Sequence, residues 1–316
     1  MCKAVRADGL TAVMAAVLAA GCVGLGASRP AGDFLVIGHR GAPAEEAENT
    51  LPSFGRAVEL GATAIETDVC LTSDARFVLW HDRDPDDAVA LLRQVGVEGL
   101  AYVPDVPDVG SEWRRPVSLL TLEELRTWYG YSTLFGARDP EARIPTLEEL
   151  FAWAATAPAL RALYLDLKFG AGEADTARAV VGTVEALLAG EPALADRTIF
   201  FLTVEPDVAS ALAGAAAGAR FDLRVARDFE SAGALDESEA LGLRDVSTGY
   251  TVGRTWPGFV DEVEVLIAAR DAGRLDTVTV WTFDGVDDWG YLLTRGVDGI
   301  MTNDPAALVR FRDAAF

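Results

Sequence analysis

The chain contains two histidines in 316 residues, and each of them ends an apolar run of the kind that forms a β-strand. His39 ends the predicted strand 35–39 and His81 ends the predicted strand 76–81. A single histidine on an apolar strand is more often a core residue with a hydrogen-bond partner, whereas two histidines at one place suit a general base and a general acid. We therefore predict that His39 and His81 are the catalytic pair.

Acidic side chains lie on two further apolar runs. Glu66 and Asp68 alternate along the predicted strand 63–70 and so share one face, and Asp166 lies near the end of the predicted strand 161–168. Converging carboxylates raise one another's pKa unless a cation neutralises them. Oxygen ligands favour a hard ion. The pattern predicts one divalent cation, Mg²⁺ or Ca²⁺, with pairing to Arg or Lys as the alternative.

Two basic residues accompany these groups. Arg40 directly follows His39, and Lys168 lies two residues after Asp166, on the same face of its strand. Cationic side chains at such positions can balance the charge of a phosphoryl group. We expect Arg40 and Lys168 to bind a phosphate of the substrate.

The elements that position these residues alternate between β-rich and helical patterns. The predicted strands are 35–39, 63–70, 76–81, 161–168, 198–204, 221–227, 277–283 and 298–302. The predicted helices are 50–60, 121–129, 146–157, 173–189, 206–217, 258–273, 286–295 and 305–313. This order predicts an α/β fold, a (β/α)8 TIM barrel. A doubly wound sheet is the rival fold, but no G-x-G-x-x-G follows the first strand.

One segment interrupts the alternation. The polar residues 83–117 follow the third predicted strand and would emerge from a barrel on its catalytic face, as an inserted cap. A structural flap is the alternative interpretation. We see no second domain, and we predict a single barrel domain over residues 34–316.

The N-terminal residues predict export. Residues 1–21 combine basic side chains with an uncharged apolar stretch that is too short to span a membrane. The letters LAAGC at 18–22 resemble a bacterial lipobox, at which Cys22 would carry lipid, and residues 22–33 would form a tether. An ordinary secretory signal is the alternative. The expected location is the cell envelope, with membrane contact only through the lipid anchor.

Composition restricts the partners. The net charge is −22 and half of the residues are hydrophobic. A strongly acidic protein gains no long-range attraction to nucleic acid or to anionic bilayers. We therefore expect a small-molecule partner and no nucleic acid.

Taken together, the motifs resemble those of a known family, the glycerophosphodiester phosphodiesterases of the phosphatidylinositol-phospholipase-C-like barrel superfamily. They occur in one order from residue 39 to residue 305. They are HRG at 39–41, ENT at 48–50, GATAIETDV at 61–69, LWHD at 79–82, IPTLEEL at 144–150, LDLK at 165–168, WTFD at 281–284 and GVDGIMTNDP at 296–305.

The resemblance implies metal-dependent hydrolysis of glycerophosphodiesters to sn-glycerol 3-phosphate and an alcohol, by paired-histidine acid/base catalysis. It implies, as the residue patterns do, that the two histidines are the catalytic acid and base. It likewise implies that the three acids bind the metal and that the two cations bind the phosphate. It also implies that Trp281 lines the substrate pocket, although a tryptophan on a barrel strand can equally be core.

Departures from the family pattern leave other functions open. Asp166 stands where the family usually has Glu, and this form is also similar to the sphingomyelinase D branch, which generally lacks the HRG and ENT motifs. A sphingomyelinase D-like or lysophospholipase D-like phospholipase is thus the second hypothesis. A non-catalytic solute-binding lipoprotein and a structural envelope protein are hypotheses of other classes. Asn303 stands where the family often has Asp, a change from which we expect little.

Overall fold

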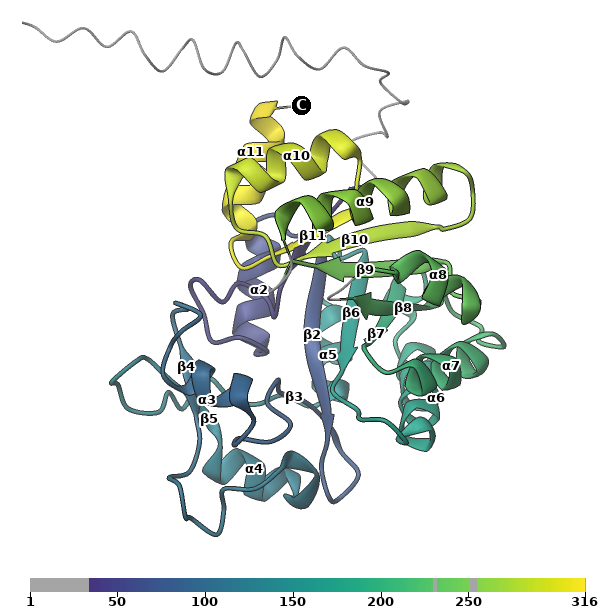
Figure 1. Ribbon diagram of the computed structural model, residues 1–316. Helices are drawn as coiled ribbons and strands as arrows, with labels where there is room; N and C mark the ends of the chain where they lie inside the picture. The colour runs from purple at the N-terminus through teal and green to yellow at the C-terminus, as the bar shows by residue number, and fades with distance from the viewer. Residues whose placement is uncertain (1–33, 230–231, 251–254, 316) are drawn as a thin grey trace, which may run out of the picture. The chain divides into compact units, whose positions relative to one another are not determined.

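The computed structural model describes residues 34–229, 232–250 and 255–315, which are built around a closed sheet of parallel strands (Figure 1). The sheet closes because β1 pairs in parallel with β11 on one side and with β2 on the other. The barrel strands are β1 (Leu35–Gly38), β2 (Ala64–Leu71), β6 (Ala162–Leu167), β7 (Thr198–Thr203), β8 (Leu223–Phe229), β9 (Asp245–Gly249), β10 (Thr277–Trp281) and β11 (Gly299–Thr302). The predicted (β/α)8 barrel is confirmed.

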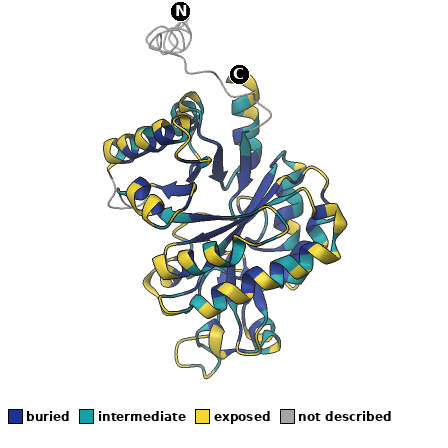
Figure 2. Cartoon of the chain, turned by 90° about the vertical axis from the view of Figure 1, so that its right-hand side faces the viewer, coloured by how far each residue is buried: buried dark blue, intermediate teal, exposed yellow. Residues whose placement is uncertain are grey.

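Helices follow the barrel strands and bury one face each against the sheet, while their outer faces are exposed (Figure 2). They are α2 (Leu51–Glu59), α5 (Leu147–Ala154), α6 (Ala174–Gly190), α7 (Pro206–Ala216), α8 (Ala234–Ala240), α9 (Trp256–Asp271), α10 (Val286–Arg295) and α11 (Pro305–Ala315). A short 3₁₀ turn, η2 (Pro192–Leu194), follows α6. The main hydrophobic core lies between this helical layer and the strands.

A second apolar cluster fills the barrel itself. Ile37, Tyr164, Phe200 and Met301 belong to it, and the rings of Tyr164 and Phe200 stack with their centroids 4.3 Å apart. Inward-facing side chains pack a small barrel solid, so a ligand can enter only at an end.

The strand prediction was wrong at two places. The predicted third strand, 76–81, forms β3 (Phe77–Leu79), which pairs antiparallel with β2 and takes no place in the barrel ring. The short link between these strands allows a hairpin, because a parallel pair needs a crossover of a dozen or more residues. The missing barrel strand is β9, whose sequence DVSTG carries too few large apolar residues to be predicted as a strand.

The chain leaves the sheet after β3 and returns to the helical layer around the barrel at α5, and we call residues 80–146 the insertion lobe. Its elements are α3 (Ala88–Gln94), β4 (Val103–Asp105), the 3₁₀ turn η1 (Val117–Leu119), α4 (Leu122–Trp128) and β5 (Gly130–Ser132). The strands β4 and β5 pair with each other, antiparallel.

The insertion lobe has a hydrophobic cluster of its own. Trp80 packs against Tyr129 and Tyr131 at ring-centroid distances of 6.0 and 5.0 Å, and Leu125 of α4 is fully buried with them. The predicted cap, 83–117, supplies α3 and β4 of this lobe. That the segment acts as a cap stays a prediction.

The predicted signal segment 1–21, the tether 22–33 and Cys22 lie outside the described residues. Within the described ranges, no helix is both long enough and apolar enough to cross a membrane.

Candidate active site

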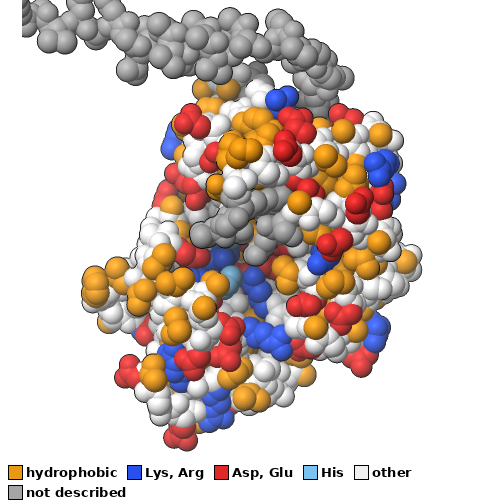
Figure 3. Space-filling model, viewed as in Figure 1, with side chains coloured by type: hydrophobic (Ala, Val, Ile, Leu, Met, Phe, Trp, Pro, Cys, Tyr) orange, Lys and Arg blue, Asp and Glu red, His pale blue; other side chains and the backbone are white. Residues whose placement is uncertain are grey.

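The predicted site residues within the described ranges all line one pocket at the mouth of the barrel. They are His39, Arg40, Glu66, Asp68, His81, Asp166, Lys168 and Trp281. All of them except His81 lie on parallel strands of the barrel or within two residues of a strand end, and the carboxyl ends of these strands converge at a single mouth. In the space-filling view, a histidine and several basic side chains lie in a hollow of the surface (Figure 3).

The turn after β1 aims Arg40 into this pocket. Arg40 and Gly41 have φ angles of 52° and 97°, and a Cβ on Gly41 would lie 2.3 Å from Ser53 Oγ, so only glycine fits there. The Arg40 N–H donates to Glu66 Oε2 at 2.9 Å, and its carbonyl accepts from the Asn49 N–H and the Ser53 hydroxyl. These contacts hold a strained backbone that the HRG motif requires.

The three predicted metal ligands form a compact cluster. Carboxylate oxygens of Glu66, Asp68 and Asp166 lie within 4.8 Å of one another. Lys168 Nζ is 2.9 Å from Asp68 Oδ1 and also contacts Asp166, and Arg40 Nε is 3.1 Å from Asp68 Oδ2. Part of the negative charge is thus neutralised by pairing, which was the alternative to metal binding.

Glu66 is the member of the cluster with the least compensation. Burial, together with the charges of Asp68 and Asp166, raises the pKa of Glu66 well above its usual value. Burial opposes the ionisation of Asp68 too. The positive charges around Asp68, that of Lys168 above all, nevertheless hold the pKa of Asp68 well below its usual value. His39 Nε2 lies 3.9 Å from Glu66 Oε2. An all-oxygen cluster with one under-neutralised carboxylate fits a hard divalent cation.

Asn49 of the ENT motif fixes the position of Asp68. Its side-chain amide donates to Asp68 Oδ2 at 2.8 Å, and its side-chain carbonyl accepts from the Asp68 N–H and from the Thr67 hydroxyl. The motif therefore acts on the site through the carboxylate cluster.

Asn303 orients His39. The Asn303 amide donates to Asp284 Oδ2 at 2.7 Å, so its Oδ1 must accept from His39 Nδ1–H, 2.8 Å away. The Nε2 atom of His39 is left as the unprotonated nitrogen. Burial, assisted by the charge of Arg40, lowers the pKa of His39 to about 4, so the ring is neutral near pH 7. The contact gives Asn303 a role that we did not expect from the sequence.

His81 reaches the same pocket by a route that the sequence did not predict. It follows β3, which runs antiparallel to β2 and brings the chain back to the mouth, where the Trp80 N–H donates to the Asp68 carbonyl at 3.1 Å. His81 thus lies in the pocket despite the error in the strand assignment, because the hairpin returns it to Asp68.

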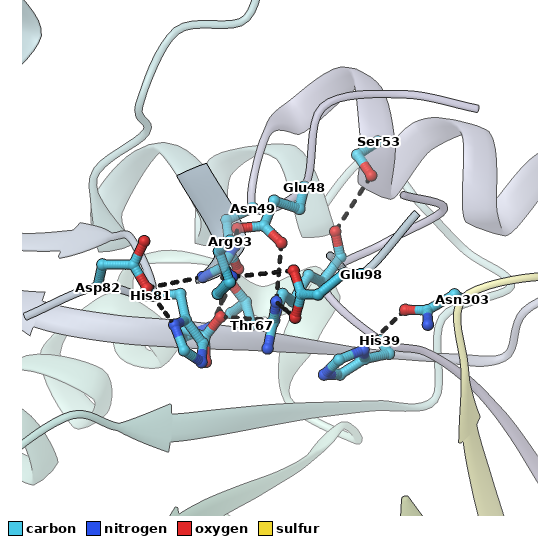
Figure 4. Close-up of polar contacts among 12 residues, drawn as sticks. His39, Glu48, Asn49, Ser53, Thr67, His81, Asp82, Arg93, Glu98 and Asn303 are labelled. Carbon is cyan, nitrogen blue, oxygen red and sulfur yellow. Dashed lines mark hydrogen bonds and ion pairs between the residues drawn. The ribbon is translucent and has the colours of Figure 1, made fainter. Parts of the chain in front are cut away.

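A buried ionic network lies behind His81 (Figure 4). His81 Nδ1 is 2.7 Å from Asp82 Oδ1, and that oxygen also accepts from Arg93 Nη1 at 2.9 Å. Glu48 is buried, contacting Arg93 and accepting from Arg40 Nη1 at 2.8 Å. The sequence analysis did not single out Arg93, because its contacts are distant in sequence.

The pocket lining also contains Trp281 and Asp228, a carboxylate that was not predicted from the sequence. The indole N–H of Trp281 donates to Asp228 Oδ1 at 2.8 Å, and Gly249 lies under the ring. Burial and the charge of Asp166 raise the pKa of Asp228 to about 7. The only signal for Asp228 was its place just after the predicted strand 221–227.

The pocket thus contains the groups that the hydrolysis of a phosphodiester requires. Two imidazoles can take up and release a proton, and fixed cations can bind a phosphoryl oxygen. Burial lowers the pKa of His81 well below its usual value, as it does for His39, so both rings can act as bases near pH 7.

Comparison with known proteins gives a family match over most of the chain. The model of the Glycerophosphoryl diester phosphodiesterase family matches residues 39–307. A glycerophosphodiester phosphodiesterase of Caldanaerobacter subterraneus is 38% identical over 117 residues, which are 37% of this chain and 39% of that protein. The match thus spans less than half the length of this curated relative.

Solved structures share the fold at low identity. A glycerophosphodiester phosphodiesterase from Parabacteroides distasonis superimposes with a TM-score of 0.64 at 21% identity, covering 89% of this chain and 98% of its own. A phosphodiesterase from Oleispira antarctica, solved in complex with the product sn-glycerol-3-phosphate, gives a TM-score of 0.63 at 18% identity, with 88% and 96% covered.

Proposed function

The chain belongs to the glycerophosphoryl diester phosphodiesterase family, and from that premise we propose that it hydrolyses glycerophosphodiesters to sn-glycerol 3-phosphate and an alcohol. The observation that carries the proposal is the convergence of His39 and His81 on one pocket with a carboxylate cluster. A solute-binding protein would need neither an acid nor a base in such a pocket.

In the proposed reaction an oxygen nucleophile forms a bond to phosphorus while the bond from phosphorus to the alcohol oxygen breaks. One histidine takes the proton of the nucleophile at Nε2, and the other gives a proton to the departing oxygen. The negative charge of the bound phosphodiester favours the protonated form of one ring, which supplies the acid. Water or the neighbouring glycerol hydroxyl can be the nucleophile, the latter through a cyclic phosphate.

Glu66, Asp68 and Asp166 would hold one divalent cation, Mg²⁺ or Ca²⁺. Such an ion, when bound, supplies Lewis-acid polarisation of the phosphoryl group. Arg40 and Lys168 line the same pocket and would orient the phosphate through charge-assisted hydrogen bonds.

The test is product analysis of the full chain with glycerophosphocholine and with lysophosphatidylcholine, after EDTA treatment and after return of Mg²⁺ or Ca²⁺. We expect sn-glycerol 3-phosphate from the first substrate only when the metal is returned. Full activity in EDTA would contradict metal dependence, and no cleavage of either substrate would overturn the proposal.

A second candidate, hydrolysis of intact lysophospholipids, is favoured by one observation. The helix α3 and the residues after it expose large apolar side chains on the insertion lobe. They are Val89, Leu91, Leu92, Val95 and Val97. An apolar surface of this kind can contact an acyl chain. Cleavage of lysophosphatidylcholine alone, in the experiment above, would select this candidate.

A further inference from the structure

We propose that Arg93, contributed by the insertion lobe, is a positioning residue that fixes the orientation and tautomer of His81 through Asp82. The proposal deepens the proposed function and rests on it for its kinetic part. It makes α3 of the insertion lobe a component of the active site.

The burial of Arg93 is the first argument. Its helix, α3, exposes Val89, Leu91 and Leu92, yet the Arg93 side chain is only 2% exposed. An arginine is seldom buried to this extent unless it is paired. The side chain therefore serves contacts inside the protein.

Those contacts form the second argument. Arg93 Nη1 donates to Asp82 Oδ1 and Nε donates to Glu98 Oε2, both at 2.9 Å, and Nη2 contacts Glu48 Oε1. Three nitrogens of one planar guanidinium thus reach three carboxylates, and a lysine ammonium lacks this fork geometry. In Figure 4 the dashed contacts run from His81 through Asp82 to Arg93.

Asp82 transmits the effect to His81. One oxygen, Oδ1, accepts from both Arg93 and His81 Nδ1, while Oδ2 is buried and has no hydrogen-bond partner within the described part of the chain. An ionised Asp82 carboxylate can only accept, which keeps the proton of His81 on Nδ1, whereas a protonated Asp82 could donate its O–H to Nδ1 instead. Burial raises the pKa of Asp82 to about 6, and the charge of Arg93 opposes that rise.

The consequence is a defined His81. With Nδ1–H donated to Asp82, the Nε2 atom is the unprotonated nitrogen and is available at the pocket. Loss of Arg93 would destabilise the ionised form of Asp82. It would also remove a contact that holds the Asp82 side chain in place. His81 would then populate both tautomers, and one of them carries its proton on the wrong nitrogen for a base.

The first experiment needs no catalytic activity. The full chain is labelled with ¹⁵N-histidine, and its two histidines are assigned from the variants His39→Ala and His81→Ala. Long-range ¹H–¹⁵N spectra near pH 7.5 report the tautomer of each ring. In Arg93→Gln we expect the His81 signals to leave the Nδ1–H pattern, while the His39 signals keep theirs.

The matched control is Arg114→Gln. Arg114 also lies in the insertion lobe with a side chain that is 5% exposed, and it contacts Asp86, Gln94 and two backbone carbonyls, none of which lines the pocket. This substitution perturbs the lobe but leaves intact the contacts from Arg93 through Asp82 to His81, which we call the relay. The His81 signals should therefore stay as in the wild type.

Kinetics test the same relay in the working enzyme. We expect Arg93→Gln to lower kcat by about tenfold or more with a smaller change in KM, and Arg93→Lys to recover part of the loss. The double variant Arg93→Gln/Asp82→Asn should be no slower than Asp82→Asn alone, because both changes interrupt one path.

The outcomes separate this inference from the proposed function. If the wild type cleaves no phosphodiester, the proposed function fails, while the NMR experiment still tests Arg93. If His81 keeps its Nδ1–H pattern in Arg93→Gln, the inference is wrong whatever the activity. Should Arg93→Gln not fold, the spectra of Arg93→Lys and Asp82→Asn decide: unchanged His81 signals in both would overturn the relay.

Discussion

At the residue scale, the two histidines are not equivalent, because different partners hold them. His39 donates to an amide oxygen of Asn303, whereas His81 donates to the carboxylate Asp82. An ionised carboxylate stabilises an imidazolium more than an amide does. Asp82 therefore favours the imidazolium form of His81. Burial and the charges of Arg40 and Arg93 oppose that form and hold the pKa of His81 well below its usual value.

Either histidine variant should be severely impaired. We expect His39→Ala and His81→Ala each to lower kcat by about 100-fold or more, because each removes one proton transfer. Steady-state kinetics with glycerophosphocholine measure the effect, and thermal unfolding of the same samples checks the fold. Near-normal turnover in either variant would remove that residue from the mechanism.

The site was predictable from the sequence to the extent that its residues lie on predicted strands or directly after them. His39, Glu66 and Asp68 could be placed in that way, since strand periodicity fixes their faces. Arg93 could not, because it lies 45 residues from Glu48 in the sequence and 11 from Asp82, and only the folded lobe brings them together. Arg93 shares the buried side of the short helix α3 with Ala90, and burial of a charged residue there has no local sequence signal.

At the element scale, the barrel was predicted for the right reason with one strand misassigned. β/α alternation set the architecture, but β3 has the apolar pattern of a barrel strand and β9 does not. The two errors cancel in the strand count. What local patterns cannot show is that Ser247 and Thr248 of β9 are fully buried by neighbouring strands.

The end of β9 also sets the position of Trp281. A Cβ at Gly249 would lie 2.6 Å from three ring carbons of Trp281, so Gly249→Ala must displace the indole and weaken its hydrogen bond to Asp228. We expect kcat/KM to fall by about tenfold, mainly through KM, with a destabilisation of about 1–3 kcal/mol from overpacking.

The control for this substitution is Gly182→Ala. Gly182 lies inside α6, and an added Cβ there meets nothing within 4 Å. This change should leave the kinetics unaltered and raise the stability by about 0.5–1 kcal/mol, since alanine is the better helix former. Equal kinetics for the two variants would show that Trp281 does not limit substrate binding.

At the scale of the whole molecule, the net charge of −22 limits the ways in which the protein can bind to a membrane. An acidic protein is repelled by anionic lipid, so surface electrostatics cannot hold it there. A lipid chain does not depend on that field, because each buried CH₂ contributes about 0.8 kcal/mol. We therefore propose that Cys22 carries a lipid anchor and that the anchor alone retains the protein at the cell envelope.

The substitution Cys22→Ser tests this proposal, because it removes the thiol to which lipid would be attached. In a bacterial host we expect the wild type to stay with the membrane fraction through a high-salt wash, since salt screens charges but does not weaken apolar contacts. The serine variant should appear in the soluble envelope fraction with unchanged specific activity. Membrane retention of the variant would refute the anchor, and release of the wild type by salt alone would do the same.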